Sequence, residues 1–252
     1  MRSENILFLD IETVPMASKL NEIPEELRHL FIEKVTKTEE DLTEEEINQR
    51  GGLYAEFGKI VCISVGLLHM KDGKRHLRIK SFYSDDEKEL LMGFAGIVNQ
   101  TSAFVHGDLA LCGHNSKSFD LPFIARRMII NNIPLPVELQ TAGKKPWEMK
   151  WIDTMELWRC GDTRHSVQLK LLCALFGITT PKDDIDGSQV AEVYYKEKNL
   201  DRIAFYCEKD VRATTQVYLR IVGEEILPDE NVYSTSFNPD GTRIENNGNE
   251  NK

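Results

Sequence analysis

The chain has 252 residues, of which 41% are hydrophobic, so it can bury one substantial core and its length does not require a second domain. Its formal net charge is −10, from 31 lysines and arginines against 41 aspartates and glutamates. This balance excludes a protein that attracts nucleic acid by its overall charge. If nucleic acid binds, local lysines or bound cations must reverse the field.

Five cysteines are present, no two of which form a Cys-x-x-Cys pair, and most lie in apolar runs. They predict buried free thiols in a reducing compartment. The apolar run at 6–9 is too short for a signal peptide, and no segment approaches the roughly 18 apolar residues of a membrane span. We therefore expect a soluble, cytoplasmic protein with no membrane partner.

The first elements expected are strands. Residues 6–12 form an apolar run that ends in two acids, and residues 59–68 are rich in β-branched side chains and almost continuously apolar. After a turn signal at 71–73, residues 76–83 alternate as in an exposed edge strand. Together these segments predict a hairpin or meander early in a sheet.

A polar segment, residues 19–52, separates the first two strands and contains the acidic block Thr-Glu-Glu-Asp-Leu-Thr-Glu-Glu-Glu at 38–46. We expect a solvated helical insertion beside the core, in preference to a binding tail. Whether this insertion covers one side of an active site stays open.

The later part of the chain alternates helices and strands. In chain order, the sequence predicts an amphipathic helix at 84–100, a strand at 109–115, a helix at 119–133, a strand or strand-like segment at 151–158, a helix at 166–178 capped by Ser166 and closed by Gly177, and a long helix from 200 to about 223. This order predicts an α/β sandwich, with a mixed central sheet flanked by helices.

The composition changes at Asp229 to asparagine, aspartate, glutamate, serine and glycine. Such a segment has too little apolar surface to support a packed structure of its own. We therefore expect one domain over residues 1–228, followed by a flexible polar tail over 229–252.

Asp10 and Glu12 are the first candidate site residues. On a strand, residues two apart face the same way, so both carboxylates project together. If they are partly buried, their repulsion raises one pKa unless a cation neutralises both, and a hard divalent ion such as Mg²⁺ or Mn²⁺ is the simplest choice. The alternative is that the strand ends at Glu12 and both acids meet water.

Asp120 is the second candidate, and it precedes Pro122 at the start of a helical pattern. It is either an ordinary helix N-cap or a ligand residue, because the apolar strand before it leads to a sheet edge of the kind where α/β proteins place ligands. Asn115, in the turn between that strand and the helix, is either a turn residue or a polar contact to substrate.

Asp210 is the third candidate. It lies at the border of the apolar stripe of the last long helix, and Tyr206 lies one turn before it on the same face. A carboxylate at such a border needs a partner. Lys209 or Arg212 can supply one in a salt bridge, which leaves a purely structural role open.

These three segments resemble the motifs of the DEDD superfamily of 3′-to-5′ exonucleases, which have a ribonuclease H-like fold. Asp-Ile-Glu-Thr at 10–13 matches the first motif, Asn-Ser-Lys-Ser-Phe-Asp at 115–120 the second, and Tyr-Cys-Glu-Lys-Asp at 206–210 the third. The tyrosine four residues before the last aspartate is typical of the DEDDy subgroup, since the histidine subgroup has histidine where this chain has Phe205. Residues 6 to about 220 are similar to stand-alone prokaryotic exonucleases related to the proofreading domain of family B DNA polymerases.

The resemblance implies a role for each acid. Asp10, Glu12 and Asp210 would hold one metal ion on the side of the nucleophile, and Asp10 would bridge to a second ion supported by Asp120. Tyr206 would orient the attacking water. The implied cofactors are two Mg²⁺ or Mn²⁺ ions, which in such sites lie about 3.5–4 Å apart and stabilise the attacking and leaving oxygens. Cations bound to four carboxylates also remove the charge barrier to a phosphate.

The resemblance also implies the substrate: nucleic acid with a single-stranded or frayed 3′ end, most simply DNA, with a role in DNA repair and an unidentified replication or repair protein as candidate partner. Thr13, Asn115 and Phe119 are the residues expected to contact substrate, although Phe119 alternatively packs as core below the site. Five basic residues are candidate phosphate ligands or ordinary surface charges: Lys117, Arg126, Arg127, Lys144 and Lys145.

Two other functions fit the sequence less well. A catalytically silent nucleic-acid-binding or scaffold module of the same fold is disfavoured because all four acids and the tyrosine are present. A zinc-dependent hydrolase is disfavoured because none of the six histidines forms a His-x-x-x-His pair or a Cys/His cluster.

Overall fold

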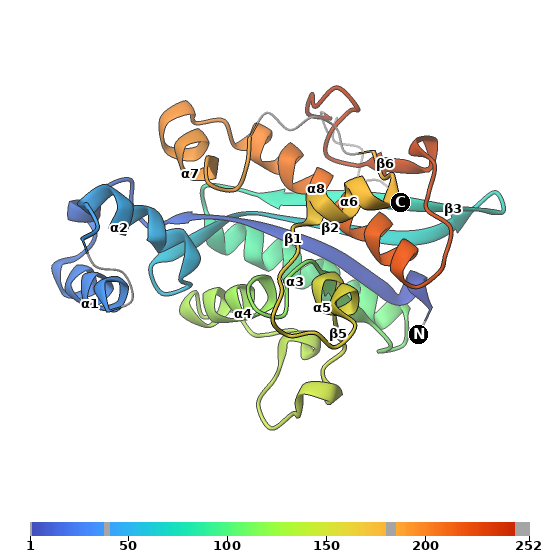
Figure 1. Cartoon of the computed structure of the whole chain (residues 1–252), viewed down its shortest axis with the longest axis horizontal. Helices are drawn as coiled ribbons and strands as arrows, with labels where there is room; N and C mark the ends of the chain where they lie inside the picture. The colour runs from blue at the N-terminus through green and yellow to red at the C-terminus, as the bar shows by residue number, and fades with distance from the viewer. Residues whose placement is uncertain (1, 38–40, 180–184, 245–252) are drawn as a thin grey trace.

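The computed structural model describes residues 2–37, 41–179 and 185–244, and its centre is one six-stranded sheet in the order β5-β4-β1-β2-β3-β6 (Figure 1). The strands are β1 (Ile6–Pro15), β2 (Gly58–Lys71), β3 (Lys74–Tyr83), β4 (Ala110–Gly113), β5 (Trp151–Asp153) and β6 (Val232–Ser234). β2 pairs antiparallel with β1 and β3, whereas β1, β4 and β5 run parallel, as do β3 and β6. The expected mixed sheet is confirmed.

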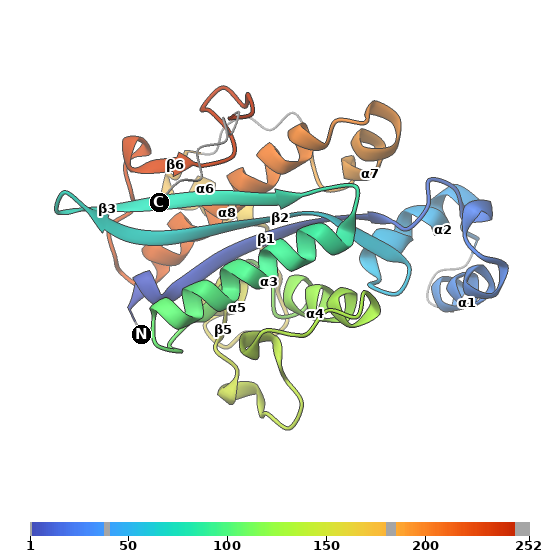
Figure 2. The ribbon, with the colours of Figure 1, turned by 180° about the vertical axis from the view of Figure 1, so that it is seen from behind.

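Helices cover both faces of this sheet, with α8 on one face and α3 on the other (Figures 1 and 2). The α-helices are α1 (Glu25–Thr36), α2 (Glu44–Arg50), α3 (Glu87–Phe104), α4 (Asp120–Ile130), α5 (Thr154–Arg159), α6 (Leu169–Phe176), α7 (Val190–Glu192) and α8 (Leu200–Ile221). A π-helical turn, η6 (Val193–Glu197), follows α7, and 3₁₀ turns lie at η1 (Ser3–Asn5), η2 (Leu20–Glu22), η3 (Gly51–Leu53), η4 (Val137–Leu139), η5 (Pro146–Glu148) and η7 (Asp229–Asn231). None of the described helices is long and apolar enough to cross a bilayer.

β1 is buried on both faces, and the alternation of its side chains divides them between two cores. On one face, Leu7, Leu9 and Ile11 pack in the core that includes α3 and α4. On the opposite face, Ile6 and Phe8 pack against residues of α8. The next two positions on that face are Asp10 and Glu12, so the strand itself carries both acids towards α8.

β1 has an irregularity next to these acids. Its pairing with β2 shifts between Glu12, which is opposite Cys62, and Thr13, which is opposite Ile60, so Val61 is an extra residue on β2. A bulge of this kind bends the strands and increases their twist, and bulges are frequent beside active sites. The bulged strand, β2, therefore bends next to the second acid of β1.

Residues 19–52 form η2, α1, α2 and η3 at the end of the sheet where β1 ends (Figure 1). These elements share a small core, in which the rings of Phe31 and Phe57 stack with 4.5 Å between their centroids. Part of the acidic block has a helix-starting role, because Thr43 and Glu46 form a reciprocal cap for α2. The segment is helical, as the sequence predicts; residues 38–40 lie outside the described residues.

The structure contradicts the expected flexible tail for residues 229–244. β6 adds a strand beside β3, which is therefore not an edge strand where the two pair. Phe237 is 2% exposed and stacks on an aromatic ring of β3. The polar composition does not indicate a flexible tail here, because a serine hydroxyl of this segment binds a buried group. Ser234 donates to the buried carboxylate of Glu208 at 2.9 Å. The remainder of the expected tail, residues 245–252, lies outside the described residues.

Two local expectations also change. Residues 151–158 split into β5 and α5, because the Asp153 carboxylate accepts hydrogen bonds from the first free N–H groups of the helix. Helix α6 begins at Leu169 instead of near Ser166. It ends at Gly177 as expected, since its φ of 66° is in the left-handed region that glycine adopts without strain.

Candidate active site

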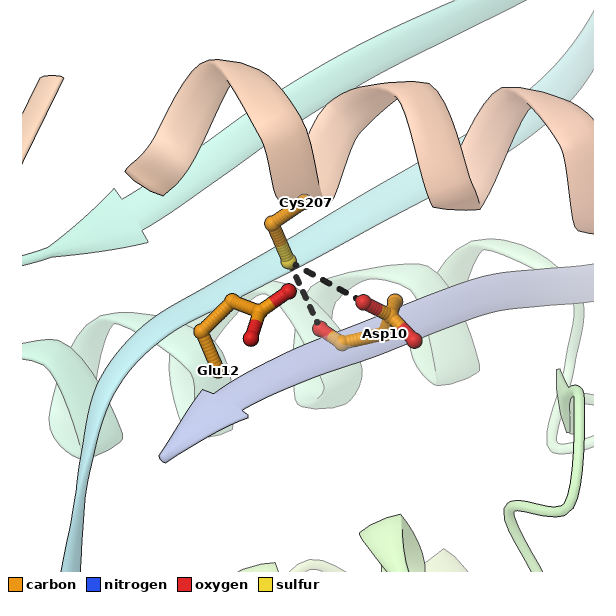
Figure 3. Close-up of side chains that lie close together, drawn as sticks. All are labelled: Asp10, Glu12 and Cys207. Atoms are coloured by element: carbon orange, nitrogen blue, oxygen red, sulfur yellow. Dashed lines mark hydrogen bonds between the residues drawn. The ribbon is translucent and has the colours of Figure 1, made fainter. Parts of the chain in front are cut away.

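Asp10 and Glu12 project from β1 towards α8 (Figure 3). Glu12 is 7% exposed, and Asp10 is partly buried. The bulge after Glu12 and the helix above both residues keep them under cover. The alternative in which the strand simply ends in water is therefore wrong.

Asp120 joins this pair from the start of α4. Its Oδ1 accepts the N–H of Ile11, the residue between the two acids, at 3.2 Å. Asp120 is 4% exposed and is the first residue of the helix, whereas Phe119 occupies the N-cap position. The N-cap alternative is therefore wrong, and the hydrogen bond to Ile11 fixes the second motif against the first.

Asp210 and Tyr206 complete the set from α8. They lie one helical turn apart, and the Tyr206 hydroxyl donates a hydrogen bond to the Asp210 carboxylate. Both side chains are partly exposed and line an open cleft of about 420 Å³, to which α6 contributes Lys170. The cleft gives solvent and ligands access to this side of the acids.

The cations next to Asp210 in sequence have other contacts. Arg212 forms an ion pair with Asp229, in the turn just before β6. The Lys209 ammonium lies 4.9 Å from the centre of the Phe205 ring. Arg212 therefore links α8 to the segment that follows it, and a salt bridge to Asp210 stays a prediction.

The acids of the site raise one another's pKa. Burial raises the pKa of Asp10 well above its usual value, and the charges of Asp210, Asp120 and Glu12 add to the effect in that order. Burial is also the first cause for Glu12, and it raises the pKa of Asp120 to about 7. Among the described residues, no lysine, arginine or histidine pairs with any of these three. The cluster is therefore stable only with bound protons or a bound cation.

Cys207 is a residue of the site that sequence reasoning missed. Its thiol projects from α8, donates to the carbonyl oxygen of Asp10 at 3.3 Å and lies 3.5 Å from the Asp10 carboxylate oxygen Oδ2 (Figure 3). The residue is fully buried. A signal was present, because Cys207 lies on the apolar stripe of the helix that carries Tyr206 and Asp210, and that stripe must face the sheet.

The three residues expected to contact substrate all have structural contacts as well. The Thr13 hydroxyl donates to the carbonyl of Gly52, in the insertion, at 2.7 Å. Asn115 has a φ of 61°, typical of a turn asparagine. The ring of Phe119 packs partly buried on the core, 5.4 Å from that of Phe123. Contact of these residues with substrate stays a prediction.

Asp153 shapes the turn of the second motif. Besides capping α5, its carboxylate accepts the N–H of Asn115 at 2.9 Å and of Lys117 at 3.0 Å, and the residue is 2% exposed. The turn is too tight for a side chain at Gly113, where a Cβ would lie 2.5 Å from the Cβ of Ser116. An acid directly after a short apolar strand was the available signal for this role.

Two of the five candidate phosphate ligands bind acids of the chain. Arg127 is 8% exposed, and its guanidinium makes two hydrogen bonds to Glu87, of 2.8 and 2.5 Å. Lys117 pairs with Glu156 at 2.6 Å on the surface. Arg127 is thus a structural residue, whereas phosphate contacts by Arg126, Lys144 and Lys145 stay predictions.

Comparison with known families adds a second line of support. A family described as "Predicted 3'-5' exonuclease related to the exonuclease domain of PolB" matches residues 53–240. The chain belongs to this family. The match includes Asp120, Tyr206 and Asp210, while the first motif precedes it. No curated protein sequence matches the chain significantly.

A solved structure supports the fold assignment of this exonuclease-like chain. The family B DNA polymerase from the hyperthermophilic archaeon Pyrobaculum calidifontis matches 85% of the chain, with a TM-score of 0.50 and 18% sequence identity. The chain corresponds to 24% of the length of that polymerase. The expected ribonuclease H-like fold is therefore confirmed, as is the expected relationship to the exonuclease domain of family B polymerases.

Proposed function

We propose that this protein is a metal-dependent 3′-to-5′ exonuclease that hydrolyses single-stranded DNA or frayed 3′ ends. One observation carries the proposal: burial raises the pKa values of three carboxylates from distant segments, Asp10, Glu12 and Asp120, and the charge of Asp210 acts on all three and raises them further. Asp210 and Tyr206 line an open cleft beside these three acids. This arrangement has the chemistry of a phosphodiester hydrolase and sits in a chain of an exonuclease-like family.

The donor set fits divalent metal ions. Carboxylate oxygens are the ligands that Mg²⁺ and Mn²⁺ prefer. Asp10, Glu12 and Asp120 pair with no lysine, arginine or histidine in the part of the chain that the structure describes, so divalent ions would neutralise them. In the proposed site, Asp10, Glu12 and Asp210 would hold one ion, and Asp10 together with Asp120 would hold a second. Two ions bound there would stabilise the attacking and leaving oxygens of a phosphodiester.

Tyr206 is the proposed positioning residue for the attacking water. Burial, followed by the charge of Asp210, raises its pKa, so the phenol stays protonated at neutral pH. Its proton is directed to Asp210, which leaves the lone pairs of the hydroxyl oxygen to accept a hydrogen bond from water. The phenol therefore orients a water molecule and does not act as a base.

The open cleft is the proposed location of the 3′-terminal nucleotide. Its volume of about 420 Å³ is in the range of small-ligand pockets, about 300–1,000 Å³, and Lys170 places a cation at its wall. A nucleotide-sized cleft favours a strand end that is already unpaired. We further propose a reducing, cytoplasmic setting and a role in DNA repair, supported by the five free cysteines and by the proposed chemistry respectively.

The test is an incubation of the purified protein with 5′-labelled single-stranded DNA and RNA of matched sequence, in Mg²⁺, Mn²⁺ or EDTA. A metal-dependent ladder that shortens from the 3′ end is expected, and it will also identify the preferred sugar. Asp10→Ala should give no ladder, whereas Asp72→Asn, at an exposed turn in the β2–β3 hairpin, should match the wild type. Tight binding of either strand without cleavage would support a catalytically silent binding module instead.

A further inference from the structure

The thiol of Cys207 lies inside the group of atoms that the site offers to a metal. One ligand atom from each of Asp10, Glu12 and Cys207 lies within 4.8 Å of the other two, and two elements, β1 and α8, supply them (Figure 3). Carboxylates alone make a site for hard cations. Adding sulfur changes the class of ion that the same atoms can bind, because thiolate is a ligand for thiophilic ions.

The spacing suits tetrahedral coordination. Zinc–sulfur bonds of about 2.3 Å and zinc–oxygen bonds of about 2.0–2.2 Å give a tetrahedron with edges of about 3.3–3.8 Å between ligand atoms. Cys207 Sγ and Asp10 Oδ2 are 3.5 Å apart, so they already span one such edge. One Glu12 carboxylate oxygen lies within 4.8 Å of both, so it has to move closer to complete a face of the tetrahedron.

Glu12 provides an independent indication of a ligand. It is 7% exposed, its carboxylate is directed at the thiol and at Asp10, and no hydrogen bond to that carboxylate occurs among the described residues (Figure 3). A buried carboxylate without a hydrogen-bond donor is costly, and a cation is the group that removes the cost.

We propose that Asp10, Glu12 and Cys207 form a site for a thiophilic divalent cation of the zinc class, in which such an ion displaces the hard ion and stops hydrolysis. On binding, the Cys207 thiol releases its proton to solvent and the sulfur forms a bond to the metal. The binding stands on the geometry alone, whereas the inhibition rests on the proposed exonuclease function.

Charge explains why this ion inhibits. A Mg²⁺ ion bound by Asp10 and Glu12 balances their two negative charges. A zinc-class ion on two carboxylates and a thiolate leaves a net charge of −1, which repels a phosphate. It also occupies oxygens that the proposed catalytic ion needs, and the Irving–Williams order favours zinc over manganese on such ligands.

The binding test uses Cd²⁺ as the probe, because thiolate–cadmium bonds produce an ultraviolet charge-transfer band that carboxylates do not. The experiment is done in a Cys160→Ser background, which removes the exposed cysteine. Adding Cys207→Ser should abolish the band, and adding Glu12→Gln should weaken binding by about tenfold or more. Cys112→Ser, a buried cysteine on β4, should leave the band unchanged. A band of equal size and affinity after Cys207→Ser overturns the proposal.

The inhibition test titrates Zn²⁺ against Mg²⁺-supported hydrolysis, with each variant normalised to its own zinc-free rate. Cys207→Ser should raise the Zn²⁺ concentration for half-inhibition by about tenfold or more, and Cys112→Ser should not change it. If Cys207→Ser does not fold, Glu12→Gln decides the binding question. A cadmium band without nuclease activity refutes the proposed function and retains the site. Equal zinc sensitivity in all variants refutes the inhibitory role.

Discussion

Glu87, at the start of α3, and Glu12, beside α8, are both buried, but their charges are neutralised differently. Arg127 binds Glu87 through two hydrogen bonds, and the N–H of Ile60 and the side chain of Asn131 also donate to it. Every lone pair of that carboxylate thus faces a donor. Asp10 and Glu12 have no cationic side chain of this kind among the described residues, and their pKa values are raised instead.

The comparison shows that burial alone does not identify a functional acid. A buried ion pair is costly to break, but it needs no further ligand because each charge already has its counterion. Glu87 therefore has a structural role. A buried group of like charges lowers the stability of the fold, so its presence indicates a role in binding a ligand. In this protein, the cation for the second set is expected from outside the chain.

The largest expected effect is on catalysis. Asp120→Asn keeps an acceptor for the Ile11 N–H but removes a charge, so hydrolysis should fall about 10³-fold. The metal-free protein should be at least as stable as the wild type, because one source of repulsion is gone. Rates on labelled single-stranded DNA and urea unfolding in EDTA measure the two effects, and a variant that is both active and destabilised contradicts the assignment.

Glu87, the acid with the structural role, should show the opposite behaviour. Glu87→Gln leaves the buried guanidinium of Arg127 without its counterion, which should lower the free energy of unfolding by about 3–5 kcal/mol. Urea unfolding monitored by fluorescence measures this loss. Glu89→Gln, on the exposed side of the same helix, is the matched control and should change stability little. Equal loss in both variants would show that the ion pair is not the cause.

The pH dependence of the metal-free protein is a third expectation. The Asp120 carboxyl loses its proton near pH 3.8 when unfolded but near 7 when folded, so the folded state binds more protons between these values. Its stabilising contribution is present below pH 3.8 and is lost as the pH rises through 7, an effect of a few kcal/mol. Thermal unfolding in EDTA should therefore show a falling midpoint from pH 5 to 8.

Two further measurements make that pH test specific. Saturating Mg²⁺ should raise the unfolding midpoint more at pH 8 than at pH 5, because the ion replaces protons that are absent at the higher pH. Asp120→Asn should reduce the difference between the unfolding midpoints at pH 5 and pH 8 in EDTA. A wild-type midpoint that rises with pH in EDTA would mean that the acids do not repel one another in the folded state.

The smallest predicted effect concerns Tyr206. Tyr206→Phe removes the hydroxyl that donates to Asp210 and should slow the chemical step about 10²-fold. Mn²⁺ binding, measured by calorimetry, should stay within a few-fold of the wild type because the carboxylates are unchanged. Tyr233→Phe, on β6, is the control for loss of a phenol elsewhere. Loss of metal binding in Tyr206→Phe would assign the tyrosine a role in holding the acids.

Much of this site could be predicted because its signals are local. The period of two along β1 puts Asp10 and Glu12 on one face, and the stripe of α8 puts Asp210 at its border. The order of the three motifs then indicates the family. None of these inferences requires knowledge of which helix covers which strand.

The rest depends on contacts between distant segments. The approach of Cys207 to Asp10 is set by how α8 packs over β1, which no local pattern encodes. The same holds for β6. Its polar sequence is typical of a solvated segment, and only the tertiary structure shows that Ser234 binds Glu208. Asp153 could have been recognised as a helix cap from the sequence. Its hydrogen bond to the N–H of Asn115 could not, because it depends on the parallel pairing of β4 and β5.

The position of β6 also has a consequence for biosynthesis. The ribosome delivers β1, with Asp10 and Glu12, before it delivers α8 and the strand β6 that binds it. Asp10 and Asp210 are 200 residues apart in the chain (210 minus 10). An unfinished polypeptide therefore carries the first two acids without the helix that completes their surroundings. The group of four acids can form only after translation has passed residue 210.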